Sequence, residues 1–213
     1  HDLCRRQRQM CIRDSYSSDT QKKEYLPKMV KGEIITAIAM TEPGTGSDLQ
    51  NIKTKATVKE NNIILNGSKT FITNGQNANL VLVVAKTDST KKAKGISIVL
   101  CEDYRKGFEK GKNLKKIGMQ AQDTSELFFN DVELPIENIL GQSGQGFGQL
   151  MDELPQERLS IAVTAIAAAE SALDWTISYT KERTAFNTKI IDFQNTKFTL
   201  AKLKSELSVA RAY

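Results

Sequence analysis

Two short segments of the sequence combine glycines, hydroxyl groups and an aromatic ring in patterns that could bind a cofactor. The first runs from Thr41 to Ser47, reads TEPGTGS and follows the apolar run Ile34–Met40. Its proline and two glycines favour a tight turn whose backbone N–H groups can face an anion or a cofactor oxygen. It lacks the third glycine of a dinucleotide-binding fingerprint, and no βαβ pattern surrounds it. By itself the segment favours the plain turn over a binding loop.

The second segment, Asn66–Gly75, reads NGSKTFITNG. Its two Asn-Gly pairs predict a turn at each end of one strand, which would form an ordinary hairpin. Strand alternation would place Phe71 and Thr73 on one face. There, an aromatic ring and a hydroxyl could cover a flat ring and hydrogen-bond to its edge. Taken alone, the segment leaves the hairpin and the binding site both open.

Few residue types are available for acid–base chemistry. The only histidine is His1, which excludes a Ser-His-Asp triad, a two-histidine metal site and an internal histidine base within this chain. The cysteines Cys4, Cys11 and Cys101 have no CxxC spacing. A disulfide framework or a zinc site is therefore not expected, and a reducing compartment fits. Proton transfer is left to carboxylates, lysines, tyrosines or cysteines, and no metal site is predicted.

Composition is ordinary for a globular protein, with 213 residues of which 39% are hydrophobic and 26% charged. The net charge of +5 is mild, and no arginine cluster is interleaved with aromatics, so nucleic acid is not an expected partner. No apolar run approaches the roughly 20 residues of a membrane span. No stretch has the pattern of a signal peptide.

The elements that must position these residues fall into groups along the chain. Residues 1–15 show no period and are predicted to be a non-native or disordered tail. Residues 16–32 predict a short helix capped near Ser18 and ended by Gly32, as the end of an N-terminal helical domain. Residues 33–137 predict a middle β domain, a small barrel or sandwich of short strands. Strands are expected at Ile34–Met40, Ile63–Leu65, Leu80–Ala85, Ile96–Leu100 and Leu127–Phe129, with turns at 61–62, 66–67, 74–75, 94–95 and 130–131.

Residues 138–213 predict the beginning of a C-terminal helical bundle. A glycine-rich linker, Gly141–Gly148, is expected to precede two helices, the second of which still runs at Tyr213 and suggests a truncated chain. The predicted fold class is therefore α+β, a small β domain flanked by helices. The apolar stripes of the two helices comprise Leu159, Val163, Ile166, Leu173 and Ile177, and Leu200, Leu203, Leu207 and Ala210.

Together, the two glycine-containing segments resemble the flavin-binding middle domain of the acyl-CoA dehydrogenase family. The resemblance covers nearly everything from about residue 20 to 213 and continues through 118–129, 135–140, 144–147 and 154–159. The AQDT and LPQERL forms look most like the long-chain acyl-CoA dehydrogenase branch. The resemblance implies FAD as cofactor and a medium- to long-chain fatty acyl-CoA as substrate, oxidised to the trans-2-enoyl-CoA. It also implies electron-transferring flavoprotein as electron acceptor and a homotetramer or dimer in the full-length parent.

The resemblance also implies roles for individual residues. Glu157 stands where the long-chain and isovaleryl-type branches place the catalytic base, although residue type alone favours a surface carboxylate. Pro155 suits a first helical turn, so Glu157 is expected near a helix N-terminus. FAD contacts are implied for Ile38, Ala39, Met40, Thr41, Glu42, Pro43, Gly44, Thr45, Gly46, Ser47, Phe71, Ile72 and Thr73. Substrate contacts are implied for Ser47, Ala93, Lys94, Pro155, Gln156 and Arg158.

Two further residues match positions that reach FAD phosphate and adenosine across a subunit interface. These are Arg183 and Gln194, and a guanidinium suits phosphate because it binds in a bidentate fork. Without the resemblance, Arg183 is also explained as a cation at a helix end. Asn187 departs from the glycine usual in the family, but asparagine tolerates the left-handed conformation.

The resemblance leaves several points open. An acyl-CoA oxidase that uses O₂, or an inactive flavin- or acyl-CoA-binding fragment, would share these motifs. Both the bacterial cytoplasm and the mitochondrial matrix fit. The 213 residues alone are expected to bind FAD poorly or not at all.

Overall fold

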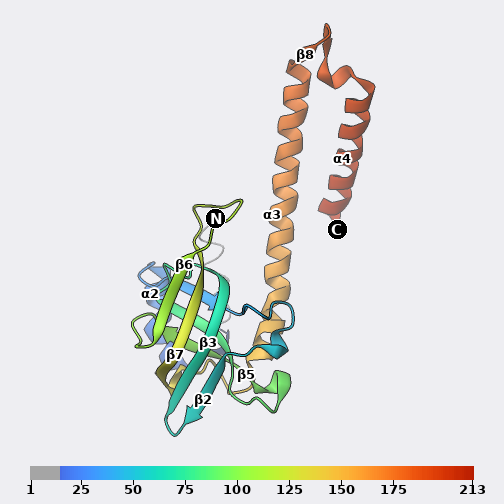
Figure 1. Ribbon diagram of the computed structural model, residues 1–213. Helices are drawn as coiled ribbons and strands as arrows, with labels where there is room; N and C mark the ends of the chain where they lie inside the picture. Colours follow the sequence, from blue (N-terminus) through green and yellow to red (C-terminus); the bar gives the residue numbers. More distant parts are fainter. Residues whose placement is uncertain (1–14) are drawn as a thin grey trace. The chain divides into compact units, whose positions relative to one another are not determined.

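The structure, a computed structural model, describes residues 15–213 (Figure 1). The predicted tail, with Cys4 and Cys11, lies outside these residues apart from Ser15. The chain forms two compact units that divide between Glu153 and Leu154. Within the described residues, no helix is long and apolar enough to cross a membrane.

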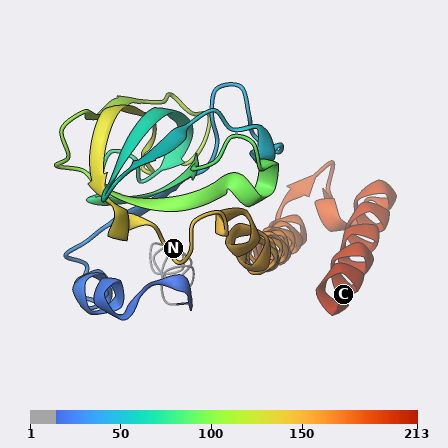
Figure 2. The same ribbon diagram turned by 90° about the horizontal axis from the view of Figure 1, so that it is seen from below.

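Helix α2 (Asp19–Val30) opens the first unit with a capping box. Ser18 Oγ accepts from Gln21 N at 3.2 Å, and Gln21 Oε1 accepts from Ser18 N at 3.0 Å. The helix ends before Gly32, whose φ of 76° confirms the predicted stop. Figure 2 shows α2 below the sheet, where Gln21 Nε2 donates to the Glu137 carbonyl at 2.7 Å.

A mixed seven-stranded sheet follows in the order β1-β4-β2-β3-β7-β6, with β5 against β4. Strands β1 and β2 pair with β4 in parallel, and the other pairs are antiparallel. The sheet curls into a half-barrel, which with the helices confirms the predicted α+β class. The strands are β1 (Thr36–Ala39), β2 (Lys55–Lys59), β3 (Asn62–Thr73), β4 (Leu80–Lys86), β5 (Ile96–Glu102), β6 (Phe108–Asn113) and β7 (Thr124–Pro135).

The core lies on the concave side of this sheet and collects alternate residues of β3 and β7. Ile63, Leu65, Leu127 and Phe129 are almost completely buried there. The Phe129 ring stacks on Phe108 with centroids 5.1 Å apart. Two short 3₁₀ turns, η1 (Leu49–Asn51) and η2 (Lys92–Gly95), connect strands, and a third, η3 (Ile136–Asn138), follows β7.

Two of the predicted turns are wrong, because Asn66-Gly67 and Asn130-Asp131 lie inside β3 and β7. The strands shift register at this point, and the two segments hold each other as a bulge. Asn66 Nδ2 donates to Asp131 Oδ1, and Asp131 N donates to Asn66 Oδ1, both at 2.9 Å. Gly67 has a φ of 147°, and a Cβ there would lie 2.7 Å from Thr54 Cα. The glycine therefore permits a close backbone approach rather than a chain reversal.

Strands β2 and β6 were absent from the sequence prediction. Their sequences, KATVK and FEKGKN, carry lysines and glutamate on an exposed face. These charged residues conceal the alternation of apolar and polar residues that predicts a strand. The turn at Asn74-Gly75 is confirmed, and 94–95 falls within η2. The β2–β3 hairpin closes at 60–61, one residue before the predicted turn.

Helix α3 (Gly146–Glu182) begins inside the predicted linker. A Cβ at Gly146 would lie 2.7 Å from Ser97 Cα, so the glycine lets the first helical turn approach β5. Gly144 N donates to Ser97 Oγ at 2.8 Å just before it. These glycines serve close packing rather than flexibility. Pro155 consequently lies well inside the helix, and the prediction that Glu157 lies near a helix N-terminus is wrong.

The second unit holds the rest of α3, the hairpin β8 (Thr184–Ala185) and β9 (Thr188–Lys189), the turn η4 (Ile190–Asp192) and helix α4 (Gln194–Ala212). Its apolar stripe is only partly covered. Leu173 is 6% exposed, whereas Leu159 and Val163 are 65% and 56% exposed. Within residues 154–213, the covered part lies where Arg211 Nη1 of α4 reaches Glu170 Oε2 of α3 at 3.2 Å.

Replacing Gly67 by alanine should destabilise the chain by about 2 kcal/mol or more, because the added Cβ meets Thr54 and the φ of 147° is unfavourable for other residues. Gly118→Ala is the matched control, since no heavy atom lies within 4 Å of a Cβ at that position. That variant should change the free energy of unfolding by no more than about 0.5 kcal/mol. Urea unfolding followed by circular dichroism measures both, and equal losses would contradict the close approach.

Candidate active site

The cofactor loop, residues 41–47, leaves β1 and folds back as a tight turn. Glu42 N donates to Thr45 O at 2.9 Å, and Thr45 N donates to Glu42 O at 3.1 Å. Thr70 N of β3 donates to Thr41 O at 2.9 Å, which holds the loop against that strand. The structure therefore brings together the two segments that the sequence predicts as cofactor-binding.

A buried ion pair lies beneath the loop. Lys69 Nζ is 2.9 Å from Glu42 Oε1 and donates to Met40 O at 2.9 Å, while the two charged side chains are 0% and 5% exposed. The Glu42 carboxylate also accepts from Lys53 N at 2.5 Å and from Thr54 N at 2.9 Å. Its side chain therefore faces the interior, and only its backbone is available to a cofactor.

The electrostatics of the pair follow from its burial. Burial alone raises the pKa of the Glu42 carboxyl, but the hydrogen bonds from Thr54, the Lys53 amide and Lys69 outweigh it, so that pKa lies below its usual value. Burial lowers the pKa of the Lys69 ammonium to about 8, against the attraction of Glu42, which raises it. Both groups are therefore charged at neutral pH.

The outer side of the loop is open. Pro43, Gly44, Gly46 and Ser47 are exposed, and a Cβ at either glycine would meet no heavy atom within 4 Å. Phe71 of β3 is 67% exposed and directly follows Thr70, whose N–H donates to Thr41 O at the start of the loop. An exposed aromatic face next to open backbone N–H groups suits a flat ring with polar edges. The residues present therefore fit the flavin of FAD.

A bulge, not simple alternation, gives Phe71 its exposure. Because Lys69 is buried, regular alternation would bury Phe71 as well. The register against β7 instead shifts between Lys69 and Ile72, and Phe71 takes a φ of 58°. Ile72 then enters the core at 2% exposure, and Thr73 stays half-buried outside it.

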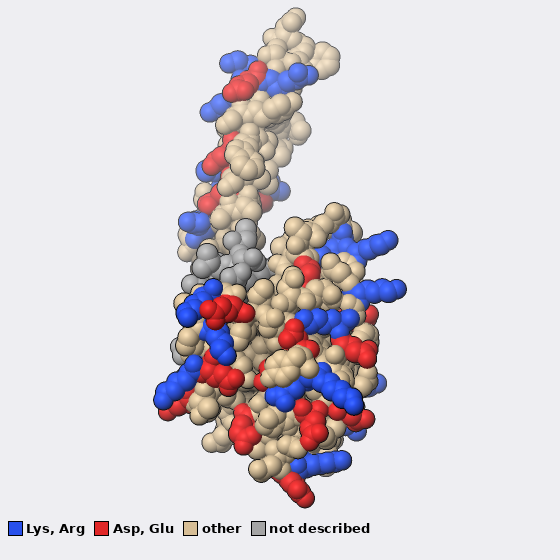
Figure 3. Space-filling view, turned by 90° about the vertical axis from the view of Figure 1, so that its left-hand side faces the viewer, with Lys and Arg blue, Asp and Glu red and all other residues tan. Residues whose placement is uncertain are grey.

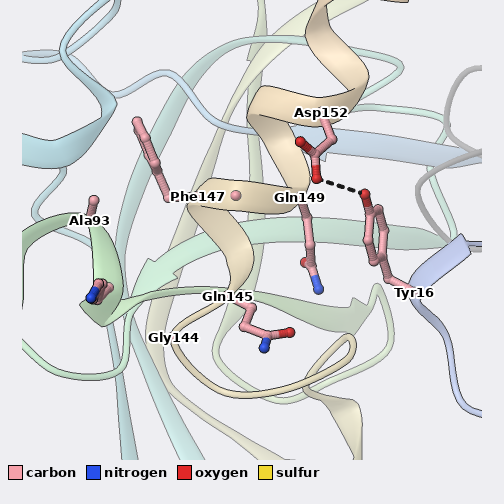
Figure 4. Close-up of a pocket in the computed structure, with 9 residues that line it drawn as sticks. Tyr16, Ala93, Gly144, Gln145, Phe147, Gln149 and Asp152 are labelled. Atoms are coloured by element: carbon pink, nitrogen blue, oxygen red, sulfur yellow. Dashed lines mark hydrogen bonds between the residues drawn. The ribbon is translucent and has the colours of Figure 1, made fainter.

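Ala93 and Lys94, predicted to contact substrate, line a separate pocket of about 390 Å³ in the first unit. Figure 4 shows Ala93 at one side and Tyr16 with Asp152 at the other. Tyr16 Oη donates to Asp152 Oδ2 at 3.3 Å, and desolvation together with that carboxylate raises the pKa of Tyr16. In the pocket wall, Gln149 Oε1 is buried without a hydrogen-bond partner.

The second unit carries the other predicted residues of the site. Glu157 is half-buried on α3, and its neighbours Pro155, Gln156 and Arg158 are exposed. The backbone there is continuous helix, so these side chains point in different directions around its axis.

Arg183 and Gln194, the predicted FAD-phosphate and adenosine contacts, lie at the same end of the helix pair. Arg183 follows α3 directly, and Gln194 begins α4. The β8–β9 hairpin between them closes at Phe186 and Asn187, whose φ angles are 52° and 59°. The left-handed conformation expected of Asn187 is thereby confirmed, and both predicted contact residues are exposed.

Three of these polar side chains were missed by sequence reasoning. The sequence does contain a signal for the burial of Lys69, because period-two alternation from Ile63 and Leu65 places this residue on the inner face of the sheet. Tyr16 and Asp152 are 136 positions apart, and no sequence pattern links them.

Charges elsewhere on the first unit are mixed. Figure 3 shows Lys and Arg interspersed with Asp and Glu over the visible face of this unit, so that face presents no broad field of one sign. Among residues 15–213, no three His, Cys, Asp or Glu side chains gather as a metal site requires.

Comparison with known proteins decides the family. The model described as "Acyl-CoA dehydrogenase, middle domain" matches residues 37–132, and "Acyl-CoA dehydrogenase, C-terminal domain" matches residues 144–213. This chain belongs to the acyl-CoA dehydrogenase family. The resemblance that carried the sequence analysis is thus confirmed.

Individual relatives agree with this assignment. The chain is 49% identical over 201 residues to mitochondrial long-chain specific acyl-CoA dehydrogenase of Sus scrofa, covering 93% of this chain and 47% of that protein. It is 41% identical over 198 residues to mitochondrial isovaleryl-CoA dehydrogenase of Pongo abelii, covering 92% and 47%. The crystal structure of acyl-CoA dehydrogenase from Geobacillus kaustophilus superposes with a TM-score of 0.92 at 47% identity, covering 95% and 54%. The chain spans about half the length of the curated relatives it matches.

The buried ammonium predicts an alkaline change in stability. The pKa of Lys69 is about 8 in the folded chain and near its ordinary 10.5 when unfolded, so between these values the unfolded state binds more protons. The free energy of unfolding should therefore rise from pH 8 to 10.5, by about 3 kcal/mol at about 1.4 kcal/mol per pH unit. The measurement is the difference in the free energy of unfolding between the unmodified chain and Lys69→Met at each pH. This subtraction cancels the contributions of the other titrating groups. A flat difference would show that Lys69 keeps an ordinary pKa when folded, and a falling one that its pKa is raised; either would contradict the prediction.

Proposed function

We propose that the protein is an FAD-dependent dehydrogenase that oxidises the Cα–Cβ bond of a medium- to long-chain fatty acyl-CoA to the trans-2-enoyl-CoA. The observation that carries the proposal is the open cofactor loop lying against the β3 bulge that exposes Phe71. The 49% identity to a long-chain specific acyl-CoA dehydrogenase supports the same reading.

The loop would orient the cofactor through its backbone. Gly44, Gly46 and Ser47 offer groups to the edge of the ring system, and Phe71 covers apolar surface beside it. FAD, when bound, supplies the acceptor for the hydride that leaves the substrate β-carbon. Thr41 and Thr73 are half-buried beside the loop and add hydroxyls.

Glu157 would remove the α-proton of the acyl thioester. The other carboxylate in the predicted contact set, Glu42, is buried and bonded to Lys69 and two backbone amides, so it cannot serve as this base. Gln156 and Arg158, the neighbours of Glu157, would contact the substrate. A carboxylate gains base strength when an apolar acyl chain excludes water from it.

The pocket lined by Ala93 and Lys94 would take part of the substrate in the first unit. Its apolar wall includes Phe147, and its polar residues include Tyr16 and Gln149. This combination suits a chain with scattered amide groups, such as the pantetheine arm of coenzyme A.

Electrons would pass to electron-transferring flavoprotein, and the protein would act as a homotetramer or dimer. Arg183 and Gln194 would contact the FAD phosphate and adenosine of a neighbouring subunit. An oxidase would give the electrons to O₂ instead. The long-chain and isovaleryl relatives are both named dehydrogenases, which favours a separate protein acceptor. Mitochondrial matrix and bacterial cytoplasm are the compartments that fit.

The test of Glu157 is its replacement by glutamine in the complete holoprotein. The variant should keep its yellow FAD but lose acyl-CoA-dependent bleaching by about 10²–10⁴-fold in rate, the usual size of a general-base contribution. Anaerobic stopped-flow absorbance at the flavin band measures this. Asp174→Asn, an exposed carboxylate further along the same helix, should bleach normally. Undiminished bleaching by the Glu157 variant would remove it from the base role.

The test of Arg183 is retention of the cofactor. Arg183→Ala should weaken FAD binding about tenfold or more, since a hydrogen bond to a charged group contributes roughly 1.5–3 kcal/mol. Arg183→Lys should lose less because it keeps the charge, although not the bidentate fork. Lys181→Ala, an exposed cation two residues earlier, is the control. Equilibrium dialysis of FAD measures all three, and unchanged retention in Arg183→Ala would count against a phosphate contact.

A further inference from the structure

Lys69 is an unusual residue to find at the centre of a strand core. It is among the largest fully buried side chains in the described part of the chain, and its ammonium group is completely shielded from solvent. A lysine is almost never fully buried unless it is paired. The Glu42 side chain is only 5% exposed and is engaged by Lys69 and two backbone amides, so the charged groups of the pair face the interior.

The contacts of the pair converge on the base of the cofactor loop. From β3, Lys69 Nζ donates to the carbonyl of Met40, the last residue before the loop, and to Glu42 within it. Glu42 in turn accepts from the amides of Lys53 and Thr54, just before β2. Three separate stretches of backbone are thus held by one carboxylate and one ammonium group.

Stability alone does not explain such a pair. A buried ion pair is often no more stabilising than well-packed apolar side chains of similar volume, because desolvation of the charges costs as much as their attraction returns. What apolar residues cannot do is satisfy the Lys53 and Thr54 amides and the Met40 carbonyl in one fixed arrangement. The pair therefore specifies a conformation.

We propose that the Glu42–Lys69 pair is a positioning device for the cofactor loop, holding its backbone from below so that Gly44, Gly46 and Ser47 present a fixed surface to the flavin. This inference rests on the proposed function, since it assumes that the loop binds FAD. Both residues act through the backbone of the loop, and neither touches the cofactor or the substrate through its side chain.

The test compares Lys69→Met with Glu102→Gln in the complete protein. Glu102 is a second buried carboxylate, 8% exposed, which accepts from Arg105 Nε and Tyr25 Oη, both at 2.8 Å, and holds α2 to β5 rather than the loop. Lys69→Met should raise the FAD dissociation constant at least tenfold. Glu102→Gln should lower the unfolding midpoint and leave FAD affinity within about twofold.

A second measurement tests how firmly the cofactor loop is held in the protein without bound FAD. In the apoprotein, Lys69→Met should speed hydrogen exchange at the amides of Thr45, Lys53 and Thr54 more than at core amides such as Val83. If Lys69→Met does not fold because Glu42 is left uncompensated, the double variant Glu42→Gln/Lys69→Met removes that charge and should show the same loss of FAD affinity.

The possible outcomes distinguish a failure of the proposed function from a failure of the inference about the Glu42–Lys69 pair. An unmodified protein that binds no FAD would overturn the proposed function and the inference with it. FAD binding by the unmodified protein and equally by Lys69→Met or the double variant would overturn the inference alone. Equal weakening by Glu102→Gln would also overturn it, because general destabilisation would then explain the effect.

Discussion

A fully buried ammonium group, that of Lys69, is the constraint that organises the first unit. Removing a charge from water costs several kcal/mol unless it is paired and fully hydrogen-bonded. Lys69 meets this condition only when Glu42 turns inward and the Met40 carbonyl faces β3. The end of β1, the loop and the approach to β2 are consequently fixed by one group. Gly44 and Gly46 stay free to face outward because Glu42, which precedes them, holds the loop from within.

Two irregularities in the pairing of β3 with β7 shape the surface that carries Phe71. A regular strand of the length of β3 would bury every second residue. At Gly67 the chain instead passes close to Thr54, and at Phe71 an extra residue turns the ring outward while Ile72 enters the core. Bulges beside binding sites re-aim side chains in this manner. The exposed aromatic face is therefore a product of departure from strand geometry.

Local patterns predicted those parts of the fold that local forces determine. The capped α2, the apolar strands β4 and β5 and the left-handed Asn187 were all accessible from the sequence. Asn66-Gly67 was misread because the same residue types suit turns and bulges, and the choice depends on Asp131, 65 positions away. In the site, the motifs identified the loop and the Phe71 segment. The pairing of Lys69 was not predicted, because a lysine in a strand is usually solvated.

The corrected position of Glu157 bears on its suitability as a base. A helix N-terminus carries partial positive charge, which stabilises a carboxylate anion and so weakens it as a proton acceptor. Glu157 instead lies about three turns after Gly146, beyond the reach of that effect. Pro155 lacks the N–H that would bond the Met151 carbonyl, so it perturbs the helix just before Glu157 without ending it. For the base role proposed for Glu157, exclusion of water around its side chain would raise its basicity, and the apolar chain of a bound acyl group is suited to provide that exclusion.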